Sequence, residues 1–168
     1  MSNTVAHHEE ILVNRQGRRV ELKMSSHPSV LRPVRLELEE FGRAAGLSCE
    51  QCDRIGLALN EALANVMRHG YGGAMDRPII VIFERRGDGA GAELEIQIRD
   101  WAKPFDPAKL PGDPPPPDPD TVKPGGLGLL CMRRLMDQVV FTPQPDGMLL
   151  TMVKKIGTEA DDKCSAGK

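Results

Sequence analysis

The stretch NEALANVMRHGY, residues 60–71, carries two periodic patterns on what reads as a single helix. Its apolar residues are spaced as the buried side of an amphipathic helix: Ala62, Leu63 and Val66. Glu61, Asn65 and His69 recur at every fourth residue, which stacks their side chains one turn apart along a second stripe. A carboxylate and a carboxamide that point the same way indicate either a solvated helix face or a ligand site.

The chain has 168 residues, a length typical of one domain with one core. Its formal net charge of -2 does not favour nucleic acid, because nucleic-acid-binding domains are usually basic. No apolar run is long enough to span a bilayer, and the first twenty residues lack the pattern of a signal peptide. We therefore expect a cytoplasmic protein that binds proteins and small molecules, and neither nucleic acid nor a membrane.

Four cysteines without a secretory context fit reduced thiols better than a disulfide framework. Ser48 followed by Gln51 is the signature of a capping box, which places Cys49 and Cys52 in the first turn of a helix. A helix dipole can acidify a thiol there, so a redox-sensing pair stays open beside an ordinary first turn. The other two cysteines stand apart in the sequence, so no zinc site of the usual spacing is completed.

The N-terminal part predicts a hairpin and then two helices. Short strand-like runs at residues 9–14 and 18–24 flank Arg15-Gln16-Gly17, a plausible turn. Apolar residues then repeat every three or four positions from Val30 to Ala45, which predicts a helix that ends at Gly46. The later elements follow from the same reasoning: a helix from Ser48 to about Arg68, strands at 78–86 and 92–100, a helix at about 128–137 and a hairpin around Pro145-Asp146-Gly147.

The segment between the second of these strands and the last helix is rich in proline. Nine of the 14 prolines lie between Pro104 and Pro124, which excludes a helix or a central strand. Irregular segments this long are usually functional lids or linkers, and too little chain follows for a second domain. The segment ends at GGLG, residues 125–128, where a helix begins; backbone amides at such a start suit phosphate, although glycines also cap and turn chains.

Three motifs in this order, LNEALANVMRHGY, IRDWAKPFDP and GGLGLLCMRRLMD, resemble the ATP-binding domain of the histidine-kinase-like ATPase superfamily, also called the Bergerat fold. Within it they look most like the anti-sigma-factor serine kinases. The resemblance covers roughly residues 20 to 155. It implies an α+β fold, a two-layer α/β sandwich with helices on one face of a mixed, mainly antiparallel sheet.

The same resemblance divides the chain into three parts. Residues 1–19 would be an N-terminal extension or an extra strand, and residues 20–156 would form the ATP-binding kinase domain. Within that domain, residues of about 107–124 would be the lid over the nucleotide. Residues 157–168 are polar and would be a C-terminal tail.

Carried over by position, the resemblance implies ATP and Mg²⁺ as cofactors and gives three polar residues a role. Asn65 would hold Mg²⁺ through its side-chain oxygen. Glu61 would accept or orient the proton of the attacking serine hydroxyl. Asp100 would accept a hydrogen bond from the adenine amino group.

Further residues would complete the nucleotide site. The helix start would admit the phosphates through Gly126, Leu127, Gly128 and Leu129. Phe105 and Ala102 would lie near the base. Ala102 stands where the family usually has glycine; if that position needs a positive φ or close approach to the base, its Cβ would weaken nucleotide binding.

Several of these residues also have a purely structural interpretation. Asp100 could be a turn former at the end of a strand. His69 is better explained as a helix-end residue that bonds nearby backbone than as a catalytic base. Trp101 and Phe105 could line the pocket or belong to the core.

The implied function is that of an anti-sigma-factor serine kinase. It would phosphorylate an anti-anti-sigma antagonist of the STAS type, sequester a sigma factor in its other state, and act as a homodimer. Phosphorylation adds about -1.5 to -2 charges at the antagonist's interface and would expel it. Two alternatives remain: a nucleotide-gated binding module without kinase activity, and a redox-responsive interaction protein that uses Cys49 and Cys52.

Overall fold

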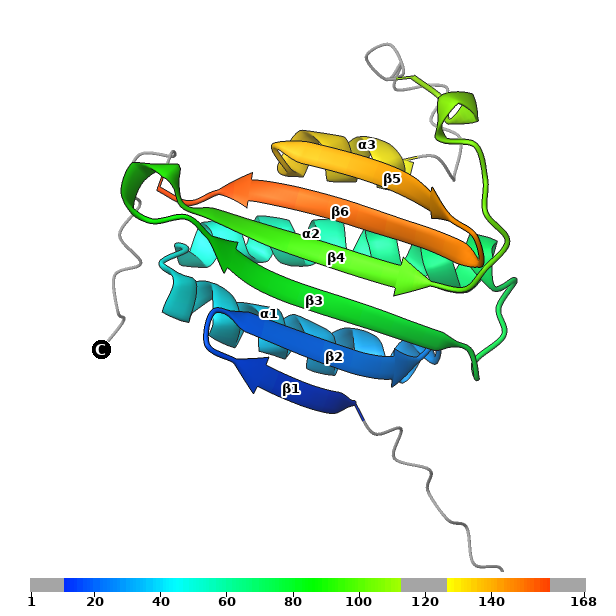
Figure 1. The fold of residues 1–168 in the computed structure, drawn as a ribbon, viewed down its shortest axis with the longest axis horizontal. Coiled ribbons are helices and arrows are strands. Elements are labelled where there is room, and N and C mark those ends of the chain that lie inside the picture. The colour runs from blue at the N-terminus through cyan, green and yellow to red at the C-terminus, as the bar shows by residue number, and fades with distance from the viewer. Residues whose placement is uncertain (1–10, 113–126, 158–168) are drawn as a thin grey trace, which may run out of the picture.

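The computed structural model describes residues 11–112 and 127–157, which form one sheet covered by helices on one face (Figure 1). Six strands pair in the order β1-β2-β3-β4-β6-β5. The strands are β1 (Leu12–Gln16), β2 (Arg19–Ser25), β3 (Pro78–Arg86), β4 (Glu93–Asp100), β5 (Gln138–Gln144) and β6 (Gly147–Lys155). The helices are α1 (Leu31–Ala45), α2 (Cys49–Asn65) and α3 (Leu127–Leu135), and they lie behind the sheet in Figure 1.

Some of the residues singled out from the sequence lie outside the described residues. They are residues 1–10, most of the expected lid with Gly126, and all but the first residue of the polar tail. No helix among the described residues is long and apolar enough to cross a membrane.

All five strand pairings are antiparallel, and the predicted α+β sandwich is confirmed. Two helices separate β2 from β3, so the chain returns in the opposite direction. One helix separates β4 from β5, which makes these two strands run the same way. However, β6 lies between β4 and β5, so these two strands are not paired with each other. The described strands therefore contain no parallel pair, which a mixed sheet would include.

The core lies between the sheet and the helices. As predicted from their strict alternation, Leu94, Ile96 and Ile98 on β4 are fully buried. The neighbouring strands contribute residues at the same register positions, such as Val81 opposite Ile98. The apolar stripes of α1 and α2 cover this face, with Leu38 and Leu59 fully buried.

The helix ends follow local sequence signals. At its C-terminus α1 stops at Gly46, whose φ of 100° is left-handed, and the Gly46 N–H donates to the carbonyl oxygen of Arg43, as predicted. Ser48 caps α2, and Gln51 completes the capping box in both directions. In the first hairpin the strands lie slightly later than predicted, because the turn residues are Gly17, with φ 56°, and Arg18.

The C-terminal end of α2 departs from the prediction. The regular helix stops at Asn65 instead of Arg68, and Val66–Gly70 form a π-helical turn. The Tyr71 N–H closes this turn by donating to the Val66 carbonyl oxygen at 2.8 Å. His69 lies within this π-helical turn, and such turns are frequent at functional sites.

Candidate functional site

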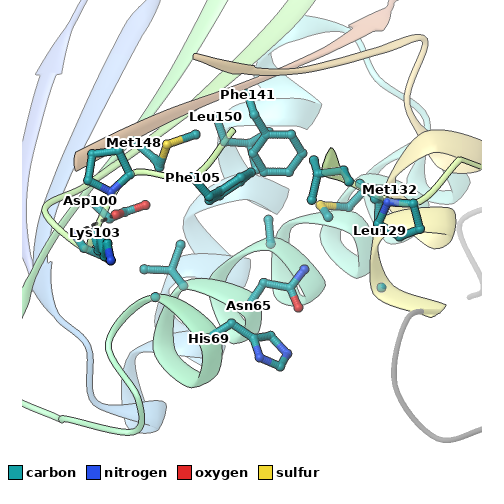
Figure 2. A pocket seen from close by; sticks show the side chains of 18 residues that line it. Asn65, His69, Asp100, Lys103, Phe105, Leu129, Met132, Phe141, Met148 and Leu150 are labelled. Carbon is teal, nitrogen blue, oxygen red and sulfur yellow. Dashed lines mark hydrogen bonds between the residues drawn. The ribbon is translucent and has the colours of Figure 1, made fainter. Parts of the chain in front are cut away.

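A cavity of about 600 Å³ opens where the end of α2, the loop after β4 and the start of α3 meet β5 and β6 (Figure 2). Its wall is mostly apolar, with a few polar side chains, a composition typical of small-molecule sites. The residues that line it are Ala62, Asn65, Val66, His69, Gly70, Asp100, Ala102, Lys103, Pro104, Phe105, Leu110, Pro111, Gly128, Leu129, Met132, Phe141, Met148 and Leu150.

Most of the nucleotide-site residues expected from the sequence meet at this cavity. Six of them line it: Asn65, Asp100, Ala102, Phe105, Gly128 and Leu129. Leu127 is not among the lining residues and is half-exposed at the start of α3. Residues from three separate segments thus surround one cavity. Unrelated surface residues would not be expected to meet in this way.

Glu61 lies beside the cavity and is not among its lining residues. A Cβ built on Gly128 would stand 2.8 Å from Glu61 Oε2 and 3.5 Å from Asn65 Nδ2. The carboxylate and the carboxamide therefore both face the backbone at the start of α3. A side chain at Gly128 would displace the Glu61 carboxylate from this position, and glycine leaves the space open.

Asp100 ends β4 and is 6% exposed. Its Oδ1 accepts a hydrogen bond from the Ala102 N–H at 2.9 Å. Burial raises the pKa of the Asp100 carboxyl, against the lowering effects of the Ala102 N–H, of the Arg99 charge and of the Met148 N–H on the neighbouring strand. Asp100 is thus both a turn former, as its structural interpretation proposed, and a buried acceptor in the wall of the cavity.

Ala102 fits its position without backbone strain. No non-glycine residue among those described has a positive φ, so the position does not require glycine for its backbone conformation. Its side chain is buried against the π-helical turn, where a Cβ added to Gly70 would come within 3.1 Å of the Ala102 Cβ. The small residue at position 70 makes room for the alanine at position 102.

The two aromatic residues after β4 take different places. Phe105 lines the cavity and packs against Phe141 of β5, with ring centroids 5.5 Å apart. Trp101 does not line it; the Arg99 guanidinium stacks over its ring at 4.6 Å, and the indole is 38% exposed. Neither residue belongs to the core, so the pocket interpretation holds for Phe105 alone.

The sequence analysis did not assign several of the lining residues to the nucleotide site. His69 faces the cavity from the π-helical turn (Figure 2), and no hydrogen bond from its ring to backbone is found within the described parts of the chain. Lys103 adds a cation near Asp100. Met148 and Leu150 come from β6, whose place beside β4 no local pattern reveals.

The buried cysteine of the pair does not have the acidic thiol that favours redox sensing. Both cysteines lie in the first turn of α2, as predicted. However, burial raises the pKa of the Cys52 thiol to about 11, with a further contribution from Cys49. The acidification that would support redox sensing is therefore not found at Cys52, which is consistent with an ordinary first turn.

A Mg²⁺ ion at this site would depend on the bound phosphates. Within residues 11–112 and 127–157 no group of three or more His, Cys, Asp and Glu side chains could hold a metal ion. Asn65 offers one oxygen at the cavity wall. Mg²⁺ commonly takes one or two protein ligands together with phosphate oxygens and water, so Asn65 fits this type of site.

The chain is similar to known proteins over most of its length. Residues 24–154 match the family described as histidine kinase-like ATPase domain. The serine-protein kinase RsbW of Oceanobacillus iheyensis is 29% identical over 147 residues, which cover 85% of this chain and 90% of that protein. RsbW of Bacillus subtilis is 27% identical over 150 residues, 85% of this chain and 89% of that protein.

A solved structure shares the fold. It contains the RsbU and RsbW domains of Rv1364c from Mycobacterium tuberculosis, with a TM-score of 0.57 and 19% identity. The match covers 82% of this chain and 32% of the longer one. The resemblance carried by the three sequence motifs is confirmed: the chain belongs to the histidine kinase-like ATPase domain family.

Proposed function

We propose that this chain is an ATP-dependent serine kinase and anti-sigma factor. It phosphorylates an anti-anti-sigma antagonist of the STAS type, and it sequesters a sigma factor when the antagonist is phosphorylated. The curated relatives named serine-protein kinase support the kinase activity. The observation that carries the proposal is the single cavity that joins Asn65, Asp100 and Gly128, with Glu61 at its edge.

Each polar group has a defined task in the proposed reaction. Asp100 accepts the adenine amino group with the carboxylate oxygen that Ala102 does not use. The phosphates lie at the start of α3, where Gly128 lets them approach the backbone. Asn65 would hold the Mg²⁺, which would supply charge neutralisation at the phosphates. Phe105, which lines the cavity, provides an apolar surface near the base.

Transfer joins the serine oxygen of the antagonist to the γ-phosphorus of ATP. The bond between the γ-phosphorus and the β–γ bridging oxygen breaks, and ADP leaves. Glu61 accepts or orients the proton of the serine hydroxyl, since its carboxylate faces the same backbone as Asn65. The homodimer expected for this family would present two such sites.

The test combines binding and transfer. Purified chain is incubated with labelled ATP, Mg²⁺ and candidate antagonist proteins, and the antagonist is analysed for phosphoserine. Capture of a purified sigma factor is measured in parallel, before and after phosphorylation. We expect phosphoserine on one antagonist. We expect the chain to bind the sigma factor only after that antagonist has been phosphorylated. ATP binding without any phosphoserine would instead favour the nucleotide-gated binding module.

Replacing Asp100 with asparagine should separate nucleotide binding from stability. The new side chain would keep an oxygen for the backbone N–H groups of Ala102 and Met148, but its amide nitrogen would then face the adenine amino group, donor against donor. We expect ATP affinity to fall about 30-fold. Calorimetry with ATP measures this loss, and an unchanged affinity would contradict the adenine contact.

The stability of the same variant should change in the opposite direction. A raised carboxyl pKa means that the folded state holds the proton more tightly. The stability contributed by this group is present at low pH and is lost as the pH rises through the raised pKa, so ionised Asp100 destabilises the fold at pH 7. We expect D100N to melt at the same or a higher temperature than wild type at pH 7, and the difference to shrink at acidic pH.

A further inference from the structure

Tyr71 lies where three segments of the nucleotide site meet. Its hydroxyl donates to the carbonyl oxygen of Pro78 at 2.6 Å and accepts the N–H of Trp101 at 2.8 Å. Its own backbone N–H closes the π-helical turn on Val66. One residue thus links the extension of α2, the start of β3 and the residue that follows β4.

The hydroxyl takes the place of a sheet hydrogen bond. The register pairs Ile79 with Asp100, so one step further Pro78 stands opposite Trp101. Proline has no N–H, and the direct bond available to this pair is from the Trp101 N–H to the Pro78 oxygen. The Tyr71 hydroxyl stands between these two groups and satisfies both. It therefore separates the main chains of β3 and β4 at the point where β4 ends.

This separation shapes the turn that holds Asp100. With the Trp101 N–H bound to the hydroxyl, the next N–H, that of Ala102, turns back onto Asp100 Oδ1. The other side of the turn rests on Gly70, the residue before Tyr71, against which the Ala102 Cβ packs. Residues 70 and 71 thus support the turn from two directions. Burial raises the pKa of the Tyr71 hydroxyl, which keeps the proton that it donates to Pro78.

We propose that Tyr71 is a positioning residue for base recognition: its hydroxyl wedge between β3 and β4 sets the Asp100–Ala102 turn that distinguishes adenine from other bases. The inference rests on the proposed function, because it takes Asp100 as the group that contacts the base. Tyr71 itself does not line the cavity and acts through Trp101 and Asp100.

The variant Tyr71→Phe tests this role. Without the hydroxyl, Trp101 and Pro78 lose their bridge, and the turn can close towards β3. We expect ATP affinity to fall about tenfold and the preference for ATP over GTP to fall by a similar factor. Affinity for inorganic triphosphate with Mg²⁺ should be unchanged, because the start of α3 is untouched. A general loosening of the fold would not single out the base in this way.

Ser26 offers a matched control. It is 1% exposed, and its hydroxyl also bridges two backbone groups, donating to the Ala74 oxygen and accepting the Arg77 N–H. These groups lie in the loop between Tyr71 and β3, and neither belongs to the Asp100–Ala102 turn. We expect Ser26→Ala to lower the melting temperature while the ratio of ATP to GTP affinity stays as in wild type. An unchanged ratio in Y71F, or an equal change in S26A, would overturn the inference.

A second measurement covers a Y71F variant that fails to fold. The chain has one tyrosine, so 3-fluorotyrosine incorporated throughout reports on position 71 alone. Its fluorine resonance should shift when adenosine is added and stay in place with triphosphate; no shift with adenosine would overturn the role. D100N separates the two hypotheses. A wild-type chain that binds no ATP contradicts the proposed function, whereas an ATP preference lost in D100N but kept in Y71F contradicts only the role of Tyr71.

Discussion

Replacing Glu61 with glutamine should lower phosphate transfer to the antagonist by about 100- to 10,000-fold, the range that a general base contributes. Glutamine keeps the shape of the side chain but cannot accept the serine proton. ATP affinity should stay within about twofold of wild type, since Glu61 lies beside the cavity and does not line it. Single-turnover transfer of labelled phosphate gives the rate, and calorimetry gives the affinity.

Glu50 provides the control on the same helix. It lies in the first turn of α2, where it pairs with Arg54 at the surface, far from the cavity. The variant Glu50→Gln makes the same chemical change and should transfer phosphate at the wild-type rate. If E61Q were as active as E50Q, Glu61 would have no part in proton transfer, and the helix stripe would be a solvated face at that position.

The residues that local patterns could identify are those whose placement depends on one element. Glu61 and Asn65 share a helix, so their spacing alone predicts that they point the same way. Asp100 ends an alternating strand, and the alternation places it on the face of Ile98. Both predictions needed only the geometry of a regular helix or strand.

The remaining walls of the cavity depend on contacts between distant segments. Phe141 reaches Phe105 because β6 is inserted between β4 and β5, a strand order that no short pattern encodes. The proximity of Gly128 to Glu61 likewise requires α3 to pack on α2, across a separation of 67 positions in the sequence, from 61 to 128. Such long-range placement is set by the packing of the whole domain.

The end of α2 shows a local feature that the sequence did not predict. The glycines after residue 69 correctly indicated that the helix stops. They did not indicate that its last turn widens. In an α-helical turn the N–H bonds the carbonyl oxygen four residues earlier, whereas the Tyr71 N–H bonds that of Val66, five residues earlier, and glycines do not encode this small difference. That difference places the Tyr71 side chain between two strands, so its link to Asp100 appears only in the structure.

Replacing Asn65 with alanine should remove the Mg²⁺-dependent part of ATP binding. In the proposed site Asn65 is the protein ligand of the ion, and its loss leaves Mg²⁺ held by phosphate and water alone. We expect affinity for ATP in the presence of Mg²⁺ to fall about 100-fold, to the value measured with a chelator, and transfer to fall with it. Calorimetric titrations with ATP, with and without Mg²⁺, measure the two affinities in each variant.

Asn60 makes the matched control for this substitution. It lies on α2 five residues before Asn65 and does not line the cavity. Its Oδ1 is buried and has no hydrogen-bond partner among the described residues, so Asn60→Ala removes an amide without breaking a described contact. N60A should keep the full effect of Mg²⁺ on ATP affinity. If N65A kept it too, the ion would be bound elsewhere, and Asn65 would contribute to the cavity only as part of its wall.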